Sequence, residues 1–235
     1  MTPSMSPALA GLQAAIVDLD GTLVDTAHDF EVALNLALGE LGLGSVTRDF
    51  ITRTVGKGSE HLLAQTLAQI GAPANLCDAL WPRYQHHYLA VNGQHSVVYP
   101  GALEGLCALR EAGWPLACLT NKPLAFARPL LADKGLAGFF DLVFGGDSFA
   151  HKKPHPLPLL KACEALGTAP AQTLMVGDSS NDAQAARAAG CPVVLVRYGY
   201  NHGEPVEHAR PDAVLQRLDE LPALLGGLHS RLMHR

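Results

Sequence analysis

Short apolar runs alternate with longer amphipathic segments along most of the chain. Five runs have the length and the flanking turn residues of buried strands, at residues 14–19, 115–120, 141–146, 173–177 and 192–196. Segments with apolar positions three and four apart, each ending near a glycine, predict helices at 103–113, 123–136, 156–167 and 181–190. This alternation predicts an α/β fold with a parallel sheet covered by helices on both faces.

The alternation is interrupted between residues 26 and 98. Three helical patterns follow one another there, at 30–43, 59–71 and 76–91, with no convincing strand among them. We therefore predict an all-helical domain at 26–98, inserted into an α/β core domain made of residues 1–25 and 99–235. Pro100 and Gly101 mark the return of the chain to the core.

Composition narrows the class of protein. The chain has 235 residues, of which 48% are hydrophobic and 17% charged, so it can bury a sizeable core. Its net charge is -5 and its first basic residue is Arg48, which argues against nucleic acid and anionic membranes as partners. No apolar run approaches the roughly 20 residues of a membrane helix. The N-terminus lacks the charge pattern of a secretory signal, so we expect a cytoplasmic protein. Both a monomer and a homodimer are compatible with the sequence.

Acidic side chains follow two of the predicted strands, where parallel sheets bind ligands beyond the strands' carboxyl ends. Asp18 and Asp20 are two residues apart, so on an extended chain their side chains point to the same side. Asp178 and Asp182 follow the fourth strand. Repulsion would raise the pKa values of these carboxyl groups unless a cation lay among them, and Mg²⁺ prefers oxygen ligands. Turn formation or helix capping would explain one such aspartate, but two sets predict a magnesium site.

Groups suited to phosphate follow the same strands. Thr120 and Asn121 precede a predicted helix, whose N-terminus favours an anion, although helix capping alone is the alternative. Gly21 permits a tight turn, and the hydroxyl of Thr22 can brace that turn or contact a phosphate. The proline after Lys153 disfavours a helix, so this lysine is expected in an extended loop as a cation for phosphate and carboxylate oxygens.

These residues form four ordered motifs, "DLDGTLVDT", "LTNK", "KKPHP" and "VGDSSND". Their order and spacing resemble those of the haloacid dehalogenase superfamily, and the resemblance covers residues 14 to about 225. It implies a Rossmann-like, three-layer α/β core, with the helical insertion as its cap domain. The further segments "GGDS", "AAGCP" and "YGYNHGEP" look like those of the bacterial phosphoglycolate phosphatases within the superfamily.

The resemblance implies a catalytic role for four residues. Asp18 would attack phosphorus and form an aspartyl-phosphate. Asp20 would protonate the leaving alcohol and then deprotonate water. Thr120 and Lys153 would hold the transferring phosphoryl group.

The resemblance also implies a cofactor, Mg²⁺. Asp178 would bind the metal together with Asp18 and the backbone carbonyl of Asp20. Asp182 would lie beside the metal without contacting it. Asp25, the third acid of the first motif, is interpreted as a hinge or capping residue where the chain leaves for the cap.

A loop in the predicted cap, "TVGKG", is a candidate for substrate selection. In relatives a glycine-containing loop here faces the active site, so Gly56, Lys57 and Gly58 are predicted to bind substrate, with an ordinary turn as the alternative. The lysine and the free backbone N–H groups of this loop would suit a small carboxylated substrate.

The expected function is the hydrolysis of 2-phosphoglycolate to glycolate and phosphate. The superfamily's dehalogenases lack an acid two residues after the nucleophile, so Asp20 favours phosphoryl transfer. Another small phosphomonoester, such as a sugar phosphate, is the main alternative substrate. A phosphomutase and a non-catalytic binding module are weaker alternatives.

Overall fold

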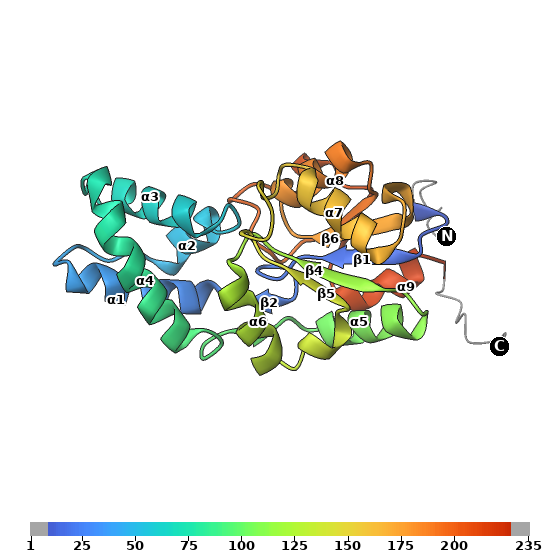
Figure 1. Cartoon of the computed structure of the whole chain (residues 1–235), viewed down its shortest axis with the longest axis horizontal. Helices are drawn as coiled ribbons and strands as arrows, with labels where there is room; N and C mark the ends of the chain where they lie inside the picture. Colours follow the sequence, from blue (N-terminus) through green and yellow to red (C-terminus); the bar gives the residue numbers. More distant parts are fainter. Residues whose placement is uncertain (1–8, 227–235) are drawn as a thin grey trace.

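The protein consists of an α/β core and a helical insertion that lie at opposite ends of its long axis (Figure 1). A computed structural model describes residues 9–226; the outermost parts of the predicted core domain, 1–8 and 227–235, lie outside the described residues. The core contains a six-stranded sheet in the order β5-β4-β1-β6-β7-β8. All neighbouring strands in it are parallel. The strands are β1 (Ala14–Val17), β4 (Leu116–Leu119), β5 (Leu142–Phe144), β6 (Thr173–Gly177), β7 (Val193–Val196) and β8 (Ala213–Leu215).

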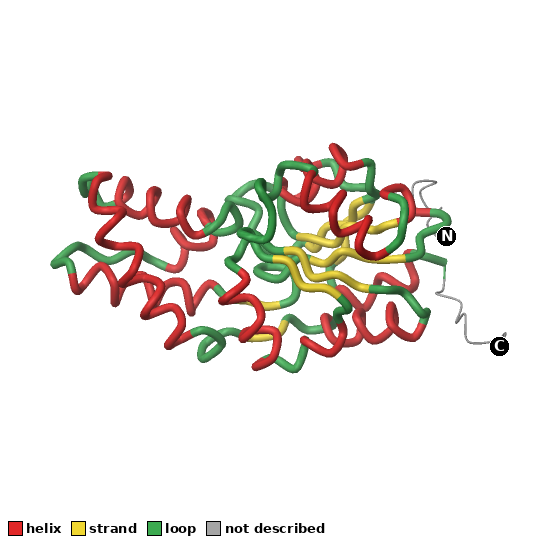
Figure 2. Tube along the Cα trace, in the orientation of Figure 1, coloured by secondary structure: helices red, strands yellow, loops and turns green. Residues whose placement is uncertain are grey.

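Helices cover both faces of this sheet (Figures 1 and 2). Along β1, Ala15 and Val17 belong to one hydrophobic cluster and Ile16 to another, as expected for a strand buried on both faces. The first cluster includes residues of α5 (Ala102–Glu111), α6 (Leu124–Asp133) and α9 (Leu221–Leu224), and the second includes residues of α7 (Leu157–Leu166) and α8 (Ser180–Ala189). The predicted three-layer α/β fold is therefore confirmed.

The helical insertion has a hydrophobic core of its own. It contains α1 (Ala27–Glu40), α2 (Arg48–Thr54), α3 (Ser59–Gln69) and α4 (Cys77–Val91). Leu34, Leu63 and Tyr84 are completely buried within it. The sequence analysis did not predict α2, a short helix whose N-terminus is capped by the side chain of Thr47.

Two chain crossings join the insertion to the core. Strands β2 (Val24–Asp25) and β3 (Val97–Val98) pair antiparallel at this junction. On the insertion side, the buried carboxylate of Asp29 accepts hydrogen bonds from the backbone N–H groups of Gly93 (2.7 Å) and His95 (2.8 Å). This carboxylate therefore ties the beginning of the insertion to its end, and the exact domain boundaries at 26 and 98 remain predictions.

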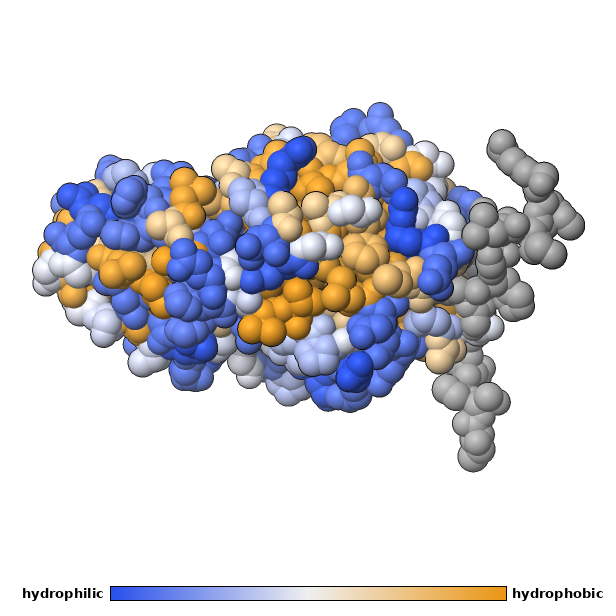
Figure 3. All heavy atoms as spheres, turned by 90° about the horizontal axis from the view of Figure 1, so that it is seen from below, coloured by the Kyte–Doolittle hydropathy of each residue, from blue (hydrophilic) through white to orange (hydrophobic). Residues whose placement is uncertain are grey.

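The surface mixes hydrophilic and hydrophobic residues, and the largest hydrophobic area on the face shown in Figure 3 lies over the core. Within residues 9–226, no helix combines the length and apolar character needed to cross a membrane.

Candidate active site

A small, partly open cavity lies where the carboxyl ends of the central strands meet the helical insertion. Its volume is about 20 Å³, room for about one water molecule. Both parts of the protein line it. The lining residues are Asp18, Asp20, Phe30, Val55, Gly56, Gly58, Ser59, Leu62, Thr120, Asn121, Lys122, Asp178, Ser179 and Tyr200.

The turn after β1 delivers the first two aspartates to this cavity. Asp18 continues the pairing with β6, because its N–H donates to the carbonyl of Val176 (2.9 Å). The carbonyl of the buried Leu19 then accepts the N–H groups of the next turn, which places Asp20 on the cavity side. Gly21 follows with φ +82°, and a Cβ at this position would lie 2.2 Å from the Asp178 carboxylate. Both the positive φ and the close approach to Asp178 therefore favour glycine at this position.

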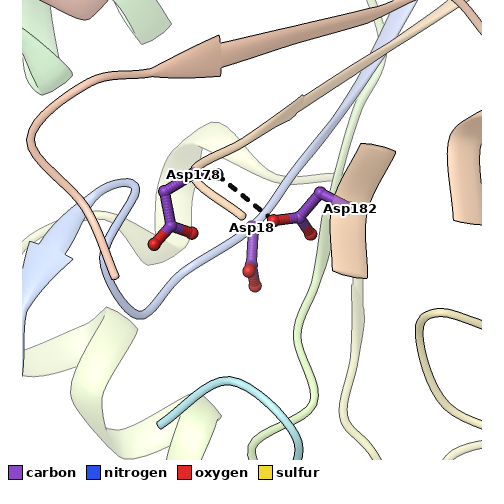
Figure 4. Close-up of side chains that lie close together, drawn as sticks. All are labelled: Asp18, Asp178 and Asp182. Atoms are coloured by element: carbon purple, nitrogen blue, oxygen red, sulfur yellow. Dashed lines mark hydrogen bonds between the residues drawn. The ribbon is translucent and has the colours of Figure 1, made fainter. Parts of the chain in front are cut away.

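Three carboxylates converge at the strand ends (Figure 4). One oxygen from each of Asp18, Asp178 and Asp182 lies within 4.8 Å of the other two. Asp182, on α8, accepts hydrogen bonds from the backbone N–H groups of Asp178 (3.2 Å) and Ser179 (3.1 Å). Its oxygens are therefore engaged by protein donors, which agrees with a place beside a metal rather than in contact with it.

Two of these carboxyls, those of Asp18 and Asp178, have raised pKa values. Burial raises the pKa of Asp18 to about 7, although the charge of Lys153 opposes the rise. Burial, followed by the charges of Asp182 and Asp18, raises the pKa of Asp178 well above its usual range. A divalent cation would favour the ionised forms of both carboxyls. The all-oxygen set fits Mg²⁺, which Asp18 and Asp178 would hold.

Lys153 is the cation beside the nucleophile candidate. Its buried Nζ lies 3.0 Å from Asp18 Oδ2 and 2.7 Å from Asp182 Oδ1, and it donates to the carbonyl of Leu119 (2.9 Å). Burial lowers the pKa of Lys153, but the two carboxylates outweigh it and raise the pKa above its usual value. The side chain of Asn121 fixes the lysine's backbone, accepting from its N–H (3.0 Å) and donating to its carbonyl (2.8 Å).

Asp20 lines the cavity and is held by two donors. Its Oδ1 accepts a hydrogen bond from the Thr26 hydroxyl (2.7 Å) and one from Lys122 Nζ (2.8 Å). The Lys122 ammonium also lies over the rings of Phe30 (4.3 Å) and Tyr88 (4.8 Å), both in the insertion. Sequence reasoning missed Lys122, although it stands in the "LTNK" motif directly after Asn121.

The insertion contributes a loop whose glycines reach the core. The carbonyl of Gly56 accepts from the side-chain amides of Asn121 (2.8 Å) and Asn181 (3.2 Å). Gly56 and Gly58 line the cavity, whereas Lys57 does not: it is exposed and lines a wide groove outside. The structure therefore separates Lys57 from Gly56 and Gly58, and the predicted residues Gly21 and Thr22 do not line the cavity either.

Two further predicted residues have partners within the protein. The Thr22 hydroxyl donates to Asp178 Oδ1 (3.0 Å), so it braces the turn and its neighbouring carboxylate. The Thr120 hydroxyl accepts the backbone N–H of Lys122 (3.2 Å), and Thr120 also lines the cavity.

The segment at 197–204 had no assigned role in the sequence analysis, and the structure brings it to the site. The N–H of Tyr200 donates to Asp178 Oδ2 (2.5 Å), and its hydroxyl accepts from the N–H groups of Thr26 (2.9 Å) and Ala27 (3.0 Å). The same hydroxyl contacts Asp25, which also accepts the N–H of Ala27 (3.2 Å) at the beginning of α1. Asp25 thus accepts the first N–H group of α1 from the position before the N-cap residue, Thr26, and its role as a hinge or capping residue stays a prediction.

Comparison with known proteins places this geometry in a family. Residues 15–196 match the family model described as haloacid dehalogenase-like hydrolase. The chain is 44% identical over 213 residues to a phosphoglycolate phosphatase of Thiobacillus denitrificans, covering 89% of this chain and 93% of that protein. It is 37% identical over 241 residues to a phosphoglycolate phosphatase of Escherichia coli K12, covering 93% and 94%.

A solved structure shows the same architecture. The crystal structure of a predicted phosphoglycolate phosphatase from Haemophilus somnus superposes with a TM-score of 0.85 at 31% sequence identity. The superposition covers 90% of this chain and 97% of that one. The likeness therefore includes both the α/β core and the helical insertion.

Proposed function

The chain belongs to the haloacid dehalogenase-like hydrolase family, and we propose that it is a Mg²⁺-dependent phosphatase that hydrolyses 2-phosphoglycolate through an aspartyl-phosphate on Asp18. One observation carries this proposal. Asp18 and Asp20 line the same cavity, but each has different partners: Asp18 is paired with Lys153, and Asp20 with Thr26 and Lys122. A non-catalytic binding module would not need two differently held acids.

The first step transfers the phosphoryl group to the enzyme. Asp18 Oδ attacks phosphorus while the bond to the leaving oxygen breaks, and Asp20 gives its proton to that oxygen. Lys153 Nζ, 3.0 Å from Asp18, steadies the nucleophile and offsets the negative charge of the phosphoryl oxygens.

The second step releases phosphate. Asp20, now ionised, takes a proton from a water molecule that attacks the phosphorus of the aspartyl-phosphate, and the Asp18 carboxylate is regenerated. The departing alcohol leaves room in the small cavity for the attacking water.

Mg²⁺, held by Asp18 and Asp178, would neutralise negative charge on the transferring group. Asp182 and Thr22 orient the residues that hold it, through the hydrogen bonds to the Asp178 backbone and carboxylate.

The relatives support the choice of substrate. Relatives that are 37–45% identical over nearly the whole chain are named phosphoglycolate phosphatase.

The test is a panel of kcat/KM values over small phosphomonoesters, with 2-phosphoglycolate, sugar phosphates and p-nitrophenyl phosphate, each with Mg²⁺ and with chelator. We expect 2-phosphoglycolate to have the highest kcat/KM and chelator to abolish turnover. A sugar phosphate that is favoured about tenfold, which is about 1.4 kcal/mol of transition-state binding, would overturn the substrate assignment. Full activity in chelator would overturn the metal requirement.

A further inference from the structure

Two buried lysines lie beside the cavity, and their ammonium groups differ in the number of oxygen atoms that they contact. Lys153 Nζ has three oxygen partners: Asp18, Asp182 and the carbonyl of Leu119. An ammonium has three N–H donors, so this one is saturated. Lys122 Nζ is equally buried but, among residues 9–226, has a single oxygen partner, Asp20. Lys122 therefore has donor capacity that the protein leaves unused.

The rest of the Lys122 ammonium faces aromatic rings of the insertion. Phe30 and Tyr88 lie 4.3 and 4.8 Å from Nζ and stabilise its charge, but they do not accept hydrogen bonds as oxygens do. The hydroxyl of Tyr88 is itself buried without a hydrogen-bond partner in the described part of the chain. An unpartnered buried donor costs free energy unless a ligand supplies an acceptor. The wall around Lys122 is thus suited to an anionic oxygen.

The chemistry of the proposed reaction brings such an oxygen to this wall. With phosphorus at Asp18 and the leaving oxygen at Asp20, the rest of the leaving group extends beyond Asp20. In 2-phosphoglycolate a single methylene separates the leaving oxygen from the carboxylate. Lys122 Nζ is 2.8 Å from Asp20 Oδ1, so the carboxylate falls within reach of this ammonium.

We propose that Lys122 binds the carboxylate of the substrate and selects small carboxylated phosphomonoesters over neutral ones. The assignment rests on the proposed function and replaces Lys57, the cation that the sequence favoured for this role. Lys57 is exposed and does not line the cavity, whereas Lys122 does. Lys122 is then a specificity residue in addition to holding Asp20.

The test compares 2-phosphoglycolate with its carboxamide, which has nearly the same shape but no negative charge on the leaving group. The ratio of their kcat/KM values reports recognition of the charge, since both depend equally on Asp18 and Asp20. We expect the wild-type ratio to be about 100, in the range for a buried charge pair. In Lys122→Met the ratio falls to near one, while Lys122→Arg, which keeps the charge, retains most of the preference.

Thr26→Val is the matched control for the second role of Lys122. Thr26 holds the same Asp20 oxygen, at 2.7 Å, but carries no charge. This variant lowers kcat for both substrates together and leaves their ratio near the wild-type value. Lys57→Met tests the competing cation, and its ratio also stays near wild type. Melting temperatures of all variants check that each protein is folded.

The outcomes separate the two proposals. If the wild type prefers 2-phosphoglycolate over the carboxamide and Lys122→Met keeps that preference, the role of Lys122 is refuted and the proposed function stands. A ratio lost in Lys57→Met but kept in Lys122→Met would return the role to the cap loop. If the wild type hydrolyses other phosphomonoesters but neither of these two, the proposed substrate is wrong and the assignment of Lys122 is wrong with it.

Discussion

Ionising Asp18 costs free energy in the metal-free protein, and this makes its stability depend on pH. Burial raises the pKa of Asp18 from its ordinary value of 3.8 to about 7 in the folded chain. Between these two values the folded state holds a proton that the unfolded state has lost. The free energy of unfolding in chelator therefore falls as pH rises through this window, the opposite of the usual behaviour of an aspartate in an ion pair.

The magnitude follows from the two pKa values. At about 1.4 kcal/mol per pH unit, the full penalty above pH 7 is about 4 kcal/mol, and most of it, about 2–3 kcal/mol, develops between pH 5 and pH 8. The raised pKa of Asp178 acts in the same direction. Mg²⁺ binds the ionised carboxylates, so it should raise the free energy of unfolding more at pH 8 than at pH 5.

Urea unfolding of the wild type and of Asp18→Asn, each in chelator at both pH values, isolates the contribution of this carboxyl. The asparagine cannot ionise, so the free energy of unfolding of the variant should fall about 2–3 kcal/mol less than that of the wild type between pH 5 and pH 8. Parallel pH profiles for the two proteins, or a wild type that gains stability relative to the variant as pH rises, would refute the reasoning.

Two further substitutions test the geometry of the site. Lys153→Met leaves two buried carboxylates without their cation and should lower the free energy of unfolding, measured by urea unfolding, by about 3–5 kcal/mol. The control is Lys161→Met, which removes an exposed lysine on α7 and should leave the free energy of unfolding nearly unchanged. Equal effects of the two substitutions would contradict the role assigned to Lys153. Gly21→Ala places a methyl group 2.2 Å from the Asp178 carboxylate and should weaken Mg²⁺ binding, measured by calorimetric titration, at least about tenfold. Gly167 has a similar φ but nothing within 4 Å of an added Cβ, so the control Gly167→Ala should lose stability and keep its Mg²⁺ affinity. An unchanged Mg²⁺ affinity in Gly21→Ala would show that the close approach to Asp178 is unimportant.

The sheet and the positions of the acidic residues could be predicted because they depend on local patterns. The apolar runs around β1 and β6 are short, bounded by turn residues and followed directly by carboxylates, so the strand ends of a parallel sheet place Asp18 and Asp178 together. Strand β8 was missed because its three residues, Ala213–Leu215, are followed directly by Gln216 and Arg217, whereas the equally short β5 ends at the turn residues Gly145 and Gly146. Its pairing with β7 depends on the rest of the sheet.

Contacts between the insertion and the core could not be read from the sequence. Lys57 was the obvious cation of the cap loop, yet the loop presents the glycines on either side of it to the cavity and turns the lysine outward. No prediction was made for Lys122 from the sequence, because its role depends on Phe30 and Tyr88, whose rings are distant in sequence but lie within 5 Å of its ammonium. Which side chains meet across the two parts of the protein is decided by tertiary packing, and no local pattern records it.

The central claim, a covalent intermediate on Asp18, can be tested by trapping that intermediate. In Asp20→Asn the second step lacks its base, whereas p-nitrophenyl phosphate has a leaving group that needs no proton, so phosphorylated enzyme should accumulate. After acid quenching with Mg²⁺ present, peptide mass mapping should find one phosphoryl group on the peptide containing Asp18, and none after prior substitution of Asp18 by Asn. Release of p-nitrophenol with no phosphorylated peptide, or a phosphoryl group on a different residue, would contradict the account.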